Sequence, residues 1–499
     1  MGIQTDFEKC PADAGDSNSS EPTKDLAHTD QVDRYGITLS PTPTTDPLDP
    51  LNWSKWRKAV VVFIACFSSF LSVYMTGAPI PSFFMLMDQF DATYSEVNWT
   101  VAIPSLGLGI GPLLCDSYAD IYGRRLVFAL STMLTILATG CTTIKSISYG
   151  GYMFCRFLQG FGAGPSIIGL AVISDISWEH ERGLRTGLWI LAVGIGGVLG
   201  SLFGGVFATI NQWWPQYHVI ILYGVLLLLI LFALPETLYP REAVVASERE
   251  HGRLPDFKRT KQIKFWHPIK IPGINHPKPW ESMVRFIKTF AYPRIVFSLL
   301  PYIFLQYWCV VGFLTMLPAV YFDKKLQIQG ALYLGLVVGT VFAEIFCSGK
   351  LSDWISGQMA KRNNNKRTPE MRLWLGYPGA ILGTIGLVVW GLMVDRHWHW
   401  MVGQVAFFLF SAGMQMGNTA VTSYIFDCYG EHPIELMTFY AAVINASAFA
   451  EPWFINYWVE DVGFTWCFAT QGLMCLALIP IYAALQIWGN KLARPMKFD

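Results

Sequence analysis

The stretch Asp116-Ser-Tyr-Ala-Asp-Ile-Tyr-Gly-Arg-Arg125 places two carboxylates and two arginines within ten residues, between two long apolar runs. These runs, at residues 97–115 and 126–144, approach the roughly 20 residues that a helix needs to cross about 30 Å of hydrocarbon. A charged loop between them is therefore expected at a membrane surface. Because Asp120 lies beside Arg124 and Arg125, a charge-assisted contact is expected to latch the two halves of the chain together on the cytosolic side.

Ten further apolar runs extend along the 499 residues in both directions from this loop. The chain is 53% hydrophobic and 14% charged, whereas a typical soluble domain has about 25% charged residues. Twelve runs exclude a soluble protein with buried helices and predict an all-α membrane protein of about twelve transmembrane helices. The predicted spans are 59–82, 97–115, 126–144, 150–173, 186–209, 217–235, 294–319, 330–349, 372–394, 398–424, 435–457 and 464–488.

Basic residues are distributed unequally between the two sides of the predicted bundle. With twelve spans, 31 of the 36 Lys and Arg residues fall in the tails and even-numbered loops, and four fall on the other side. Since positively charged loops stay in the cytosol, both termini are predicted to be cytosolic. The predicted order is a disordered N-tail, a six-helix bundle, a cytosolic loop, a second six-helix bundle and a C-tail, at residues 1–56, 57–235, 236–293, 294–489 and 490–499.

A second short loop repeats the position of the first. Gly349-Lys-Leu-Ser-Asp-Trp354 follows the second span of the second half, and its Asp353 corresponds to Asp120. This correspondence predicts two parallel six-helix repeats with a central pathway between them, as in transporters that rock between two states.

Several other classes of function lack their sequence signatures. The chain has no His-Glu-x-x-His zinc helix, no Gly-x-Ser-x-Gly elbow and no Walker loop for ATP. The ten cysteines lack paired metal spacing, and the zero net charge gives no electrostatic case for nucleic acid. The sequence thus predicts no enzyme activity, no metal, no cofactor and no nucleic-acid partner.

The 116–125 loop resembles the signature Gly-x-Leu-Ala-Asp-x-x-Gly-Arg-Arg of the major facilitator superfamily, with Asp116 where the family usually has Gly. Arg156-Phe-Leu-Gln-Gly-Phe-Gly-Ala-Gly164 resembles its fourth-helix motif, and Asp175 with Glu181-Arg182-Gly183 matches the loop that follows. The resemblance implies the family's fold over residues 47–490. It also implies a conformational gate made of Asp120, Gly123, Arg124, Arg125, Asp175, Glu181, Arg182 and Asp353.

The fifth span carries Gly196-Gly-Val-Leu-Gly-Ser-Leu-Phe-Gly-Gly205, which resembles a motif of drug:proton antiporters with Ser201 in place of its proline. Glycines spaced by four share a helix face and let a neighbouring helix approach closely. Residues 46–54 and 423–429 resemble fungal members of this group, in a branch that includes polyamine and histidinol permeases and transporters from secondary-metabolite gene clusters. The predicted helix-packing residues are Gly196, Gly200, Gly204 and Gly205.

Ionisable residues within membrane spans are rare and are functional by default. A carboxyl group in a low-dielectric interior binds its proton more tightly, so it is able to load and release one near neutral pH. Glu451 lies deep in span eleven, Glu344 near the cytosolic end of span eight, Asp427 at the end of span ten and Arg156 within span four. These four residues are the candidates for proton coupling. The alternatives are structural roles, such as helix capping by Asp427, whereas Arg156 is expected to pair with a carboxylate or to hold a proton-linked network.

Seven other polar or aromatic residues lie at apolar depth. Buried amides need hydrogen-bond partners, and aromatic rings stack on flat or cationic ligands. Each residue alone is also compatible with packing between helices, but together they predict a mixed cavity for an organic molecule. The candidates for substrate binding are Tyr74, Gln306, Trp308, Gln415, Asn418, Tyr440 and Asn445.

The leading hypothesis is a proton-coupled transporter that exports a drug, toxin or secondary metabolite and so confers drug resistance. The alternative is uptake of a polyamine or another organic cation, with Glu344, Asp427 and Glu451 as counter-charges; a transporter-like receptor would share the fold. The expected partners are the lipid bilayer, protons and a small organic substrate, the energy source is the proton gradient, and the chain is expected to be a monomer. The plasma membrane is the expected location, with a vacuolar or other organelle membrane as the alternative.

Overall fold

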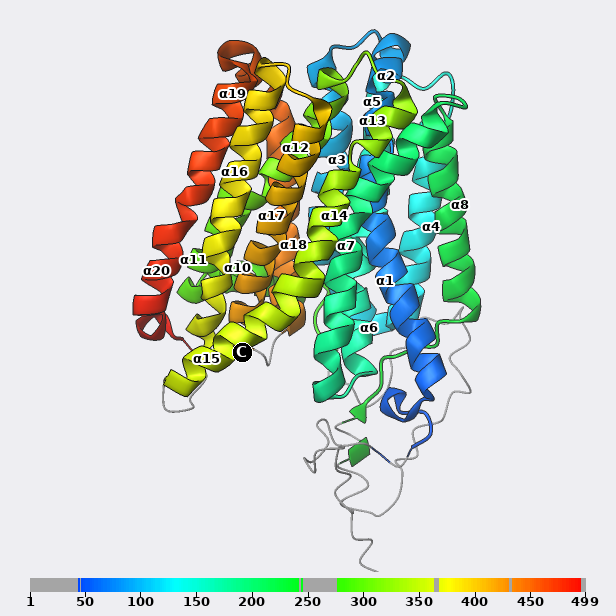
Figure 1. Cartoon of the computed structure of the whole chain (residues 1–499). Coiled ribbons are helices and arrows are strands. Elements are labelled where there is room, and N and C mark those ends of the chain that lie inside the picture. Colours follow the sequence, from blue (N-terminus) through cyan, green and yellow to red (C-terminus); the bar gives the residue numbers. More distant parts are fainter. Residues whose placement is uncertain are drawn as a thin grey trace, which may run out of the picture. The chain divides into compact units, whose positions relative to one another are not determined.

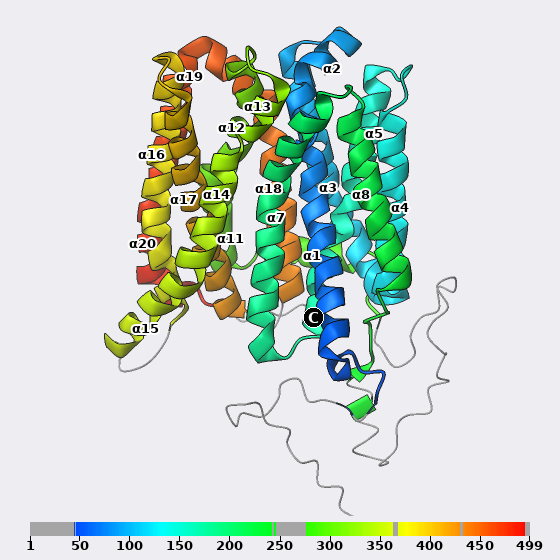
Figure 2. The same ribbon diagram turned by 45° about the vertical axis from the view of Figure 1, so that its right-hand side comes forward.

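The computed structural model describes residue 44 and residues 46–241, 244–245, 276–362, 368–429 and 433–494. All of these residues belong to one compact unit, Pro43–Asp499. Most of them lie in long helices that run side by side (Figure 1; Figure 2).

The first half of the bundle contains the helices from α1 to α8, joined by short turns. Ser54 accepts a hydrogen bond from the backbone of Arg57 at the start of α1, and Thr93 with Glu96 forms a capping box at the start of α3. The elements are η1 (Pro50–Asn52), α1 (Lys55–Gly77), η2 (Ile80–Ser82), α2 (Phe83–Phe90), α3 (Tyr94–Tyr122), α4 (Arg124–Thr142), α5 (Tyr149–Ala163), η3 (Gly164–Ile167), α6 (Ile168–Asp175), α7 (Glu179–Ala208) and α8 (Trp214–Phe232).

The second half begins with a short amphipathic helix and continues with the remaining membrane helices. Its elements are α10 (Glu281–Thr289), α11 (Pro293–Tyr302), η4 (Ile303–Tyr307), α12 (Cys309–Val320), α13 (Leu326–Ala331), α14 (Leu334–Phe342), η5 (Ala343–Leu351), α15 (Ser352–Arg362), η6 (Pro369–Leu375), α16 (Gly376–Asp395), α17 (Trp400–Tyr429), α18 (Pro433–Ala450), η7 (Glu451–Trp453), α19 (Ile455–Leu476), α20 (Leu478–Trp488) and η8 (Gly489–Leu492).

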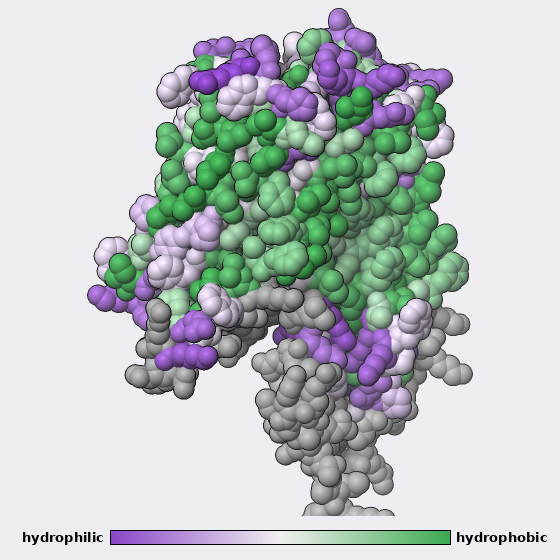
Figure 3. All heavy atoms as spheres, viewed as in Figure 1, coloured by the Kyte–Doolittle hydropathy of each residue, from purple (hydrophilic) through white to green (hydrophobic). Residues whose placement is uncertain are grey.

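The described residues contain ten helical segments that are long and apolar enough to cross a membrane. The helices α17 and α18 run beside them and complete the predicted twelve (Figure 2). Both carry amides, such as Gln415 and Asn445, which make them more polar than a simple membrane anchor. Figure 3 shows the result as a broad hydrophobic belt between two hydrophilic ends, which is the surface that a bilayer requires.

Proline and π-helical turns interrupt several of the spans. The π turn η4 follows Pro301, whose ring nitrogen has no hydrogen to donate to the helix. A second π turn, η5, lies between α14 and α15, and Pro452 ends the helical run of α18 in η7. Because π turns free backbone and side-chain groups from the regular helical pattern, they often occur at functional sites.

The two halves meet closely at the end of the bundle where α3 begins, here called the Trp99 end. The indole rings of Trp99 and Trp453 stack with centroids 4.3 Å apart, and the hydroxyl of Tyr94 donates to the Thr315 carbonyl at 2.6 Å. A Cβ atom on Gly205 of α7 would lie 2.6 Å from the Leu326 carbonyl oxygen at the start of α13. These contacts join the halves at this end.

At the opposite end, here called the Arg124 end, α3, α18 and α10 form a junction between the halves. Thr438 donates to Asp116 Oδ2 at 2.9 Å, so the residue that departs from the family signature contacts the other half. The hydroxyls of Ser117 and Ser282 are 2.8 Å apart, and Arg285 pairs with Glu435 at 2.8 Å.

The described residues change two of the predicted boundaries. Residues 46–54 belong to the predicted disordered tail, but they form η1 and its caps, and Asp49 is fully buried. The predicted polar loop at 236–293 contains α10, and the side chains of Met283 and Ile287 in this helix and of Trp280 just before it are exposed apolar groups. Residues 1–43, 246–275 and 495–499 lie outside the described part of the chain.

Candidate functional site: a central cavity and its gates

A cavity lies between the two halves, near the middle of the bundle. Its walls come from α1, α3, η3 and α7 on one side and from η4, α12, α14, α17 and α18 on the other. About 1490 Å³ of empty space lies among these residues, part of it continuous with solvent. Four predicted substrate residues are in the wall, namely Gln415, Asn418, Tyr440 and Asn445.

The cavity wall is mostly apolar, with a few uncharged polar groups. Among the described residues, no Asp, Glu, Lys, Arg or His lines it. The wall from the first half supplies hydroxyls, as from Ser72 and Ser105, among aliphatic groups, whereas the wall from the second half supplies the amides of α17 and α18. Such a cavity suits an uncharged organic molecule, since a few placed polar groups orient a ligand and apolar groups bury it.

The hydrogen bonds of the three amides determine what they offer to a ligand. Gln415 Nε2 donates to Glu344 Oε2 at 2.7 Å, and Asn445 Nδ2 donates to the Ala441 carbonyl at 2.8 Å. Both partners are acceptors, so each of these amides keeps its carbonyl oxygen for another group. Asn418 Oδ1 accepts from the Tyr440 hydroxyl at 2.8 Å.

Glu344 lies just behind the cavity wall, in the π turn η5. Its side chain is half-buried and connects to the cavity through Gln415. On its other side it faces α7 of the first half, where a Cβ atom on Gly187 would lie 3.9 Å from Glu344 Oε1. Glu344 is therefore one hydrogen bond from the cavity and lies at the boundary between the halves.

Three predicted substrate residues lie elsewhere, because each has partners inside its own half. The hydroxyl of Tyr74 is 3.0 Å from His218 Nε2. Gln306 donates to the Gly379 carbonyl at 3.1 Å, and the ring of Trp308 packs on Phe454. None of the three lines the cavity.

Glu451 is fully buried within the second half, outside the cavity wall. Its Oε2 accepts from the Gly312 backbone at 2.9 Å, and its Oε1 has no hydrogen-bond partner among the described residues. An ionised carboxylate is costly to bury without a cation. This environment thus favours the neutral acid.

Arg156 is fully buried and joins three helices of the first half. Its guanidinium donates to the carbonyls of Met75 and Thr100 and to the side chain of Gln159. Among the described residues no carboxylate pairs with Arg156, and backbone carbonyls take the place of the predicted carboxylate partner. Gln159 continues the network to Thr139 at 2.8 Å.

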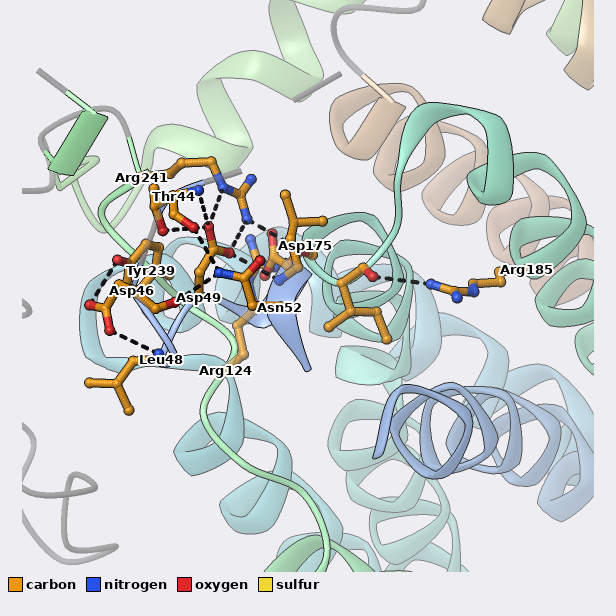
Figure 4. A network of polar contacts seen from close by, with 12 residues as sticks. Thr44, Asp46, Leu48, Asp49, Asn52, Arg124, Asp175, Arg185, Tyr239 and Arg241 are labelled. Atoms are coloured by element: carbon orange, nitrogen blue, oxygen red, sulfur yellow. Dashed lines mark hydrogen bonds and ion pairs between the residues drawn. The ribbon is translucent and has the colours of Figure 1, made fainter. Parts of the chain in front are cut away.

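The predicted gate residues of the first half gather around Arg124. Its guanidinium pairs with Asp175 (Figure 4). It also lies 3.6 Å from Asp120 Oδ1. Both partners belong to the first half, so these contacts do not form the predicted latch between the two halves. Asp175 belongs to the end of α6, so the ion pair joins two helices that the sequence separates by about 50 residues. Arg125 donates to the Leu231 carbonyl at the end of α8.

Glu236 completes this cluster, although it was not predicted from the sequence. Its carboxylate accepts the backbone N–H groups of Arg124 and Arg125 at 3.0 and 3.1 Å, where α4 begins. Gly123 has φ +98°, and a Cβ there would lie 2.6 Å from Glu236 Oε2, so only glycine fits this turn. Burial raises the pKa of Glu236, while these N–H donors and Arg124 act in the opposite direction.

The segment before α1 is bound to the same cluster through Arg241. Arg241 Nη2 pairs with the buried Asp49 at 3.0 Å and donates to the Asp175 carbonyl at 3.3 Å (Figure 4). Tyr239 donates to Asp46 Oδ2 at 3.0 Å, and burial raises the pKa of this tyrosine. The Asp46–Ser54 motif is therefore a docked segment, whereas its family resemblance alone predicted no structural role.

The second half repeats the gate ion pair with different residues. Arg372 at the start of span nine pairs with Asp427 at the end of α17, at 3.1 Å, as Arg124 pairs with Asp175. Asp427 was a candidate for proton coupling, but the structure places it outside the cavity with a half-exposed side chain. Asp353 lies in α15, and its side chain is outside the described part.

The remaining predicted gate and packing residues lie along α7. Glu181 pairs with Arg185 at 2.8 Å, and Arg182 lies in the same first turns. Cβ atoms on Gly196, Gly200 and Gly204 would lie 2.0 to 2.5 Å from carbonyl oxygens of residues 70–78, so these glycines hold α7 against the first span. Gly205 faces α13 of the other half instead.

The described residues contain no group of three or more His, Cys, Asp or Glu side chains that is placed to bind a metal ion.

Comparison with known proteins agrees with this architecture. The chain is 26% identical to the MFS transporter cpaT of Aspergillus oryzae, over 91% of each protein. It is 25% identical to the probable drug/proton antiporter YHK8 of Saccharomyces cerevisiae, covering 82% of this chain and 79% of that one. The xylose transporter XylE of E. coli, in a partially occluded inward-open conformation, superposes with a TM-score of 0.61 at 15% identity, over 86% of this chain and 99% of XylE. Residues 62–448 match the Major Facilitator Superfamily, and the chain belongs to this family.

Proposed function

We propose that this protein is a proton-coupled exporter of uncharged organic molecules, which works by alternating access to the central cavity. The observation that carries the proposal is the uncharged cavity wall with Glu344 one hydrogen bond behind it. Related proteins support export, since they include a probable drug/proton antiporter and an efflux pump, MFS2 of Trichophyton rubrum, which is 24% identical over 94% of this chain and 78% of that pump.

Uptake of a polyamine has weaker support. That function needs counter-charges for a polycation, and the three carboxylates considered for this role do not line the cavity. Asp427 is paired with Arg372, Glu451 is buried in the second half, and Glu344 accepts a hydrogen bond from Gln415.

The proposal also covers orientation and assembly. We place the Arg124 end in the cytosol, because the basic residues of the even-numbered loops gather there, and the plasma membrane is the proposed location. Both walls of the cavity come from one chain, so a monomer is sufficient for transport.

Transport by purified protein in liposomes tests the proposal. Vesicles with an acidic interior should accumulate an uncharged fluorescent aromatic amide, because outward proton flow drives its entry, and nigericin should release it by collapsing the pH gradient. The charged trimethylammonium analogue of the same dye is the matched control and should not accumulate. Equal accumulation with and without the pH gradient would contradict proton coupling, and preference for the cation would support the polyamine alternative.

A further inference from the structure

The contact between Glu344 and Gln415 links a titratable group to the substrate cavity, and the inference drawn from it rests on the proposed function. Glu344 is outside the cavity wall, whereas Gln415 is in it. The two side chains come from η5 and α17, and the distance between Glu344 Oε2 and Gln415 Nε2 is 2.7 Å. Among the described residues, no other carboxylate forms a hydrogen bond with a residue that lines the cavity.

The chemistry of this bond fixes the orientation of the Gln415 amide. An ionised carboxylate only accepts hydrogen bonds, so the amide must present its NH₂ group to Glu344. Its Oε1 then points away from Glu344, and a Cβ atom on Gly194, another residue of the wall, would lie 3.8 Å from it. Oε1 has no hydrogen-bond partner among the described residues, so the cavity presents an acceptor at this position.

Protonation of Glu344 removes this requirement and lets the amide take the opposite orientation, because the acid keeps an acceptor oxygen and gains an O–H donor. A proton taken from water adds to the carboxylate, and the new O–H group becomes a donor, while no other covalent bond changes. The amide of Gln415 then turns by half a rotation about its last side-chain bond, so that Oε1 accepts from Glu344 and the NH₂ group faces the cavity. We propose that Gln415 in this way converts the protonation state of Glu344 into the hydrogen-bonding character of the substrate site.

The groups that face Glu344 come from α17, from α7 and from its own segment. From α17, Gln415 is its partner and Thr419 bonds to Ser348 one turn further on, at 2.8 Å. From α7, Gly187 faces it. On the preceding turns of α7, Glu181 pairs with Arg185, and Arg182 lies in the same turns. The side chains of Lys350 and Asp353, on the same segment as Glu344, lie outside the described residues.

The consequence is competition between a proton and a substrate that carries N–H or O–H donors. With Glu344 ionised, the acceptor at Gln415 binds such a donor; with Glu344 protonated, two donors face each other and the substrate leaves. An exchanger needs this reciprocal coupling between its two ligands. The inference therefore specifies the substrate class as uncharged organic molecules with at least one hydrogen-bond donor.

Binding of two matched dyes tests the inference on the full-length protein in lipid nanodiscs. One dye is a coumarin with a primary aromatic amine, and the other is its N,N-dimethyl counterpart, which is uncharged but lacks the donor. At alkaline pH the primary amine should bind about fivefold more tightly, the effect of one hydrogen bond, and at acidic pH this preference should disappear.

The coupling of Glu344 protonation to the orientation of the Gln415 amide is here called the relay. Three variants separate the relay from a general loss of dye binding. Glu344→Gln should make the preference independent of pH, and Gln415→Leu should abolish it at every pH. Asn418→Ala is the matched control, because it removes another amide of the wall and should weaken binding of both dyes while the pH dependence stays. A wild-type preference that does not change with pH, or a Glu344→Gln variant that keeps the wild-type pH dependence, would overturn the relay.

Two outcomes distinguish the relay from the proposed function. If neither dye binds wild-type protein at any pH, the assignment of the cavity is wrong and the relay falls with it. If the pH-dependent preference is present but a pH gradient drives no accumulation in liposomes, the relay is supported and the proposed proton-driven export is contradicted.

Discussion

Gly205 of α7 and Gly330 of α13 touch backbone to backbone across the boundary between the two halves. A Cβ atom on Gly205 would lie 2.9 Å from the Gly330 Cα, and one on Gly330 would lie 3.3 Å from the Gly205 Cα. Any larger side chain at Gly205 must therefore push the halves apart at the Trp99 end, because backbone atoms cannot move aside as a flexible side chain does.

Gly205→Val should keep the Trp99 end from closing and should lower the transport rate by about tenfold or more, while substrate still binds. The readout is transport in liposomes together with the reactivity of a cysteine introduced in the cavity toward a membrane-impermeant thiol reagent. The matched control is Gly224→Ala, since a Cβ atom at Gly224 would meet nothing within 4 Å. Normal turnover by Gly205→Val would show that this contact is not part of the cycle.

Asp175→Asn should slow turnover more than Asp120→Asn does. Asp175 is the closer partner of Arg124, and its side chain is 24% exposed, whereas that of Asp120 is 40% exposed. Because exposed ion pairs contribute little, Asp120→Asn should change the rate by only about twofold. Substrate affinity should stay nearly constant in both variants, so the measurement is turnover at saturating substrate beside equilibrium binding. The reverse order of effects would contradict the ranking drawn from this geometry.

Asp49→Ala and Arg241→Ala should each release the segment before α1. Asp49 is fully buried, and removal of one partner leaves the other charge unpaired, at a cost of about 3 kcal/mol. Limited proteolysis should then cut near residues 44–54 faster than in wild type, and thermal stability should fall. Lys55→Ala, at an exposed position beside the segment, is the control. Unchanged cleavage in both variants would mean that the docked segment does not depend on this pair.

Glu451→Gln should leave transport nearly intact, whereas Glu344→Gln should abolish accumulation driven by a pH gradient. A glutamine at 451 still accepts the Gly312 N–H through its carbonyl oxygen and avoids a buried charge. Initial rates of accumulation in liposomes provide the comparison, and equal amounts of folded protein are verified by size-exclusion chromatography. Loss of gradient-driven transport in Glu451→Gln would contradict this expectation and would support the role in proton coupling that the sequence predicted for Glu451.

Much of the fold was predictable, because a helix that crosses a membrane needs about 20 mostly apolar residues and such runs are visible in the sequence. The amides of α17 and α18 were predictable in the same way, since Gln415, Asn418 and Asn445 are polar at apolar depth. The same criterion also selected Tyr74 and Gln306, which do not line the cavity, because depth does not reveal which face of a helix a side chain occupies. Their partners, His218 and the Gly379 carbonyl, lie within their own halves.

Residues that act through distant partners were not predictable from the sequence. Glu236 is separated from the helix start that it caps by 112 residues, and no local pattern connects the two. Asp427 looked like an isolated carboxylate near the membrane until the fold placed Arg372 beside it. One signal for these ion pairs is present in the sequence. In each half, an Arg lies at the start of the third span and an Asp lies at the end of the fourth span.

The 30 residues of α7 make a rod about 45 Å long. Gly196, Gly200 and Gly204 pack the half of α7 that ends near Gly205 against the first span, while Gly187 faces Glu344 nearer the other end and Gly205 meets α13. Because α7 is a stiff rod packed on the first span, it tilts together with the first half, so a tilt that moves one tip toward the second half swings the other tip away. The two entrances of the cavity are thus mechanically opposed through a single helix, and exclusive opening to one side of the membrane follows from its stiffness.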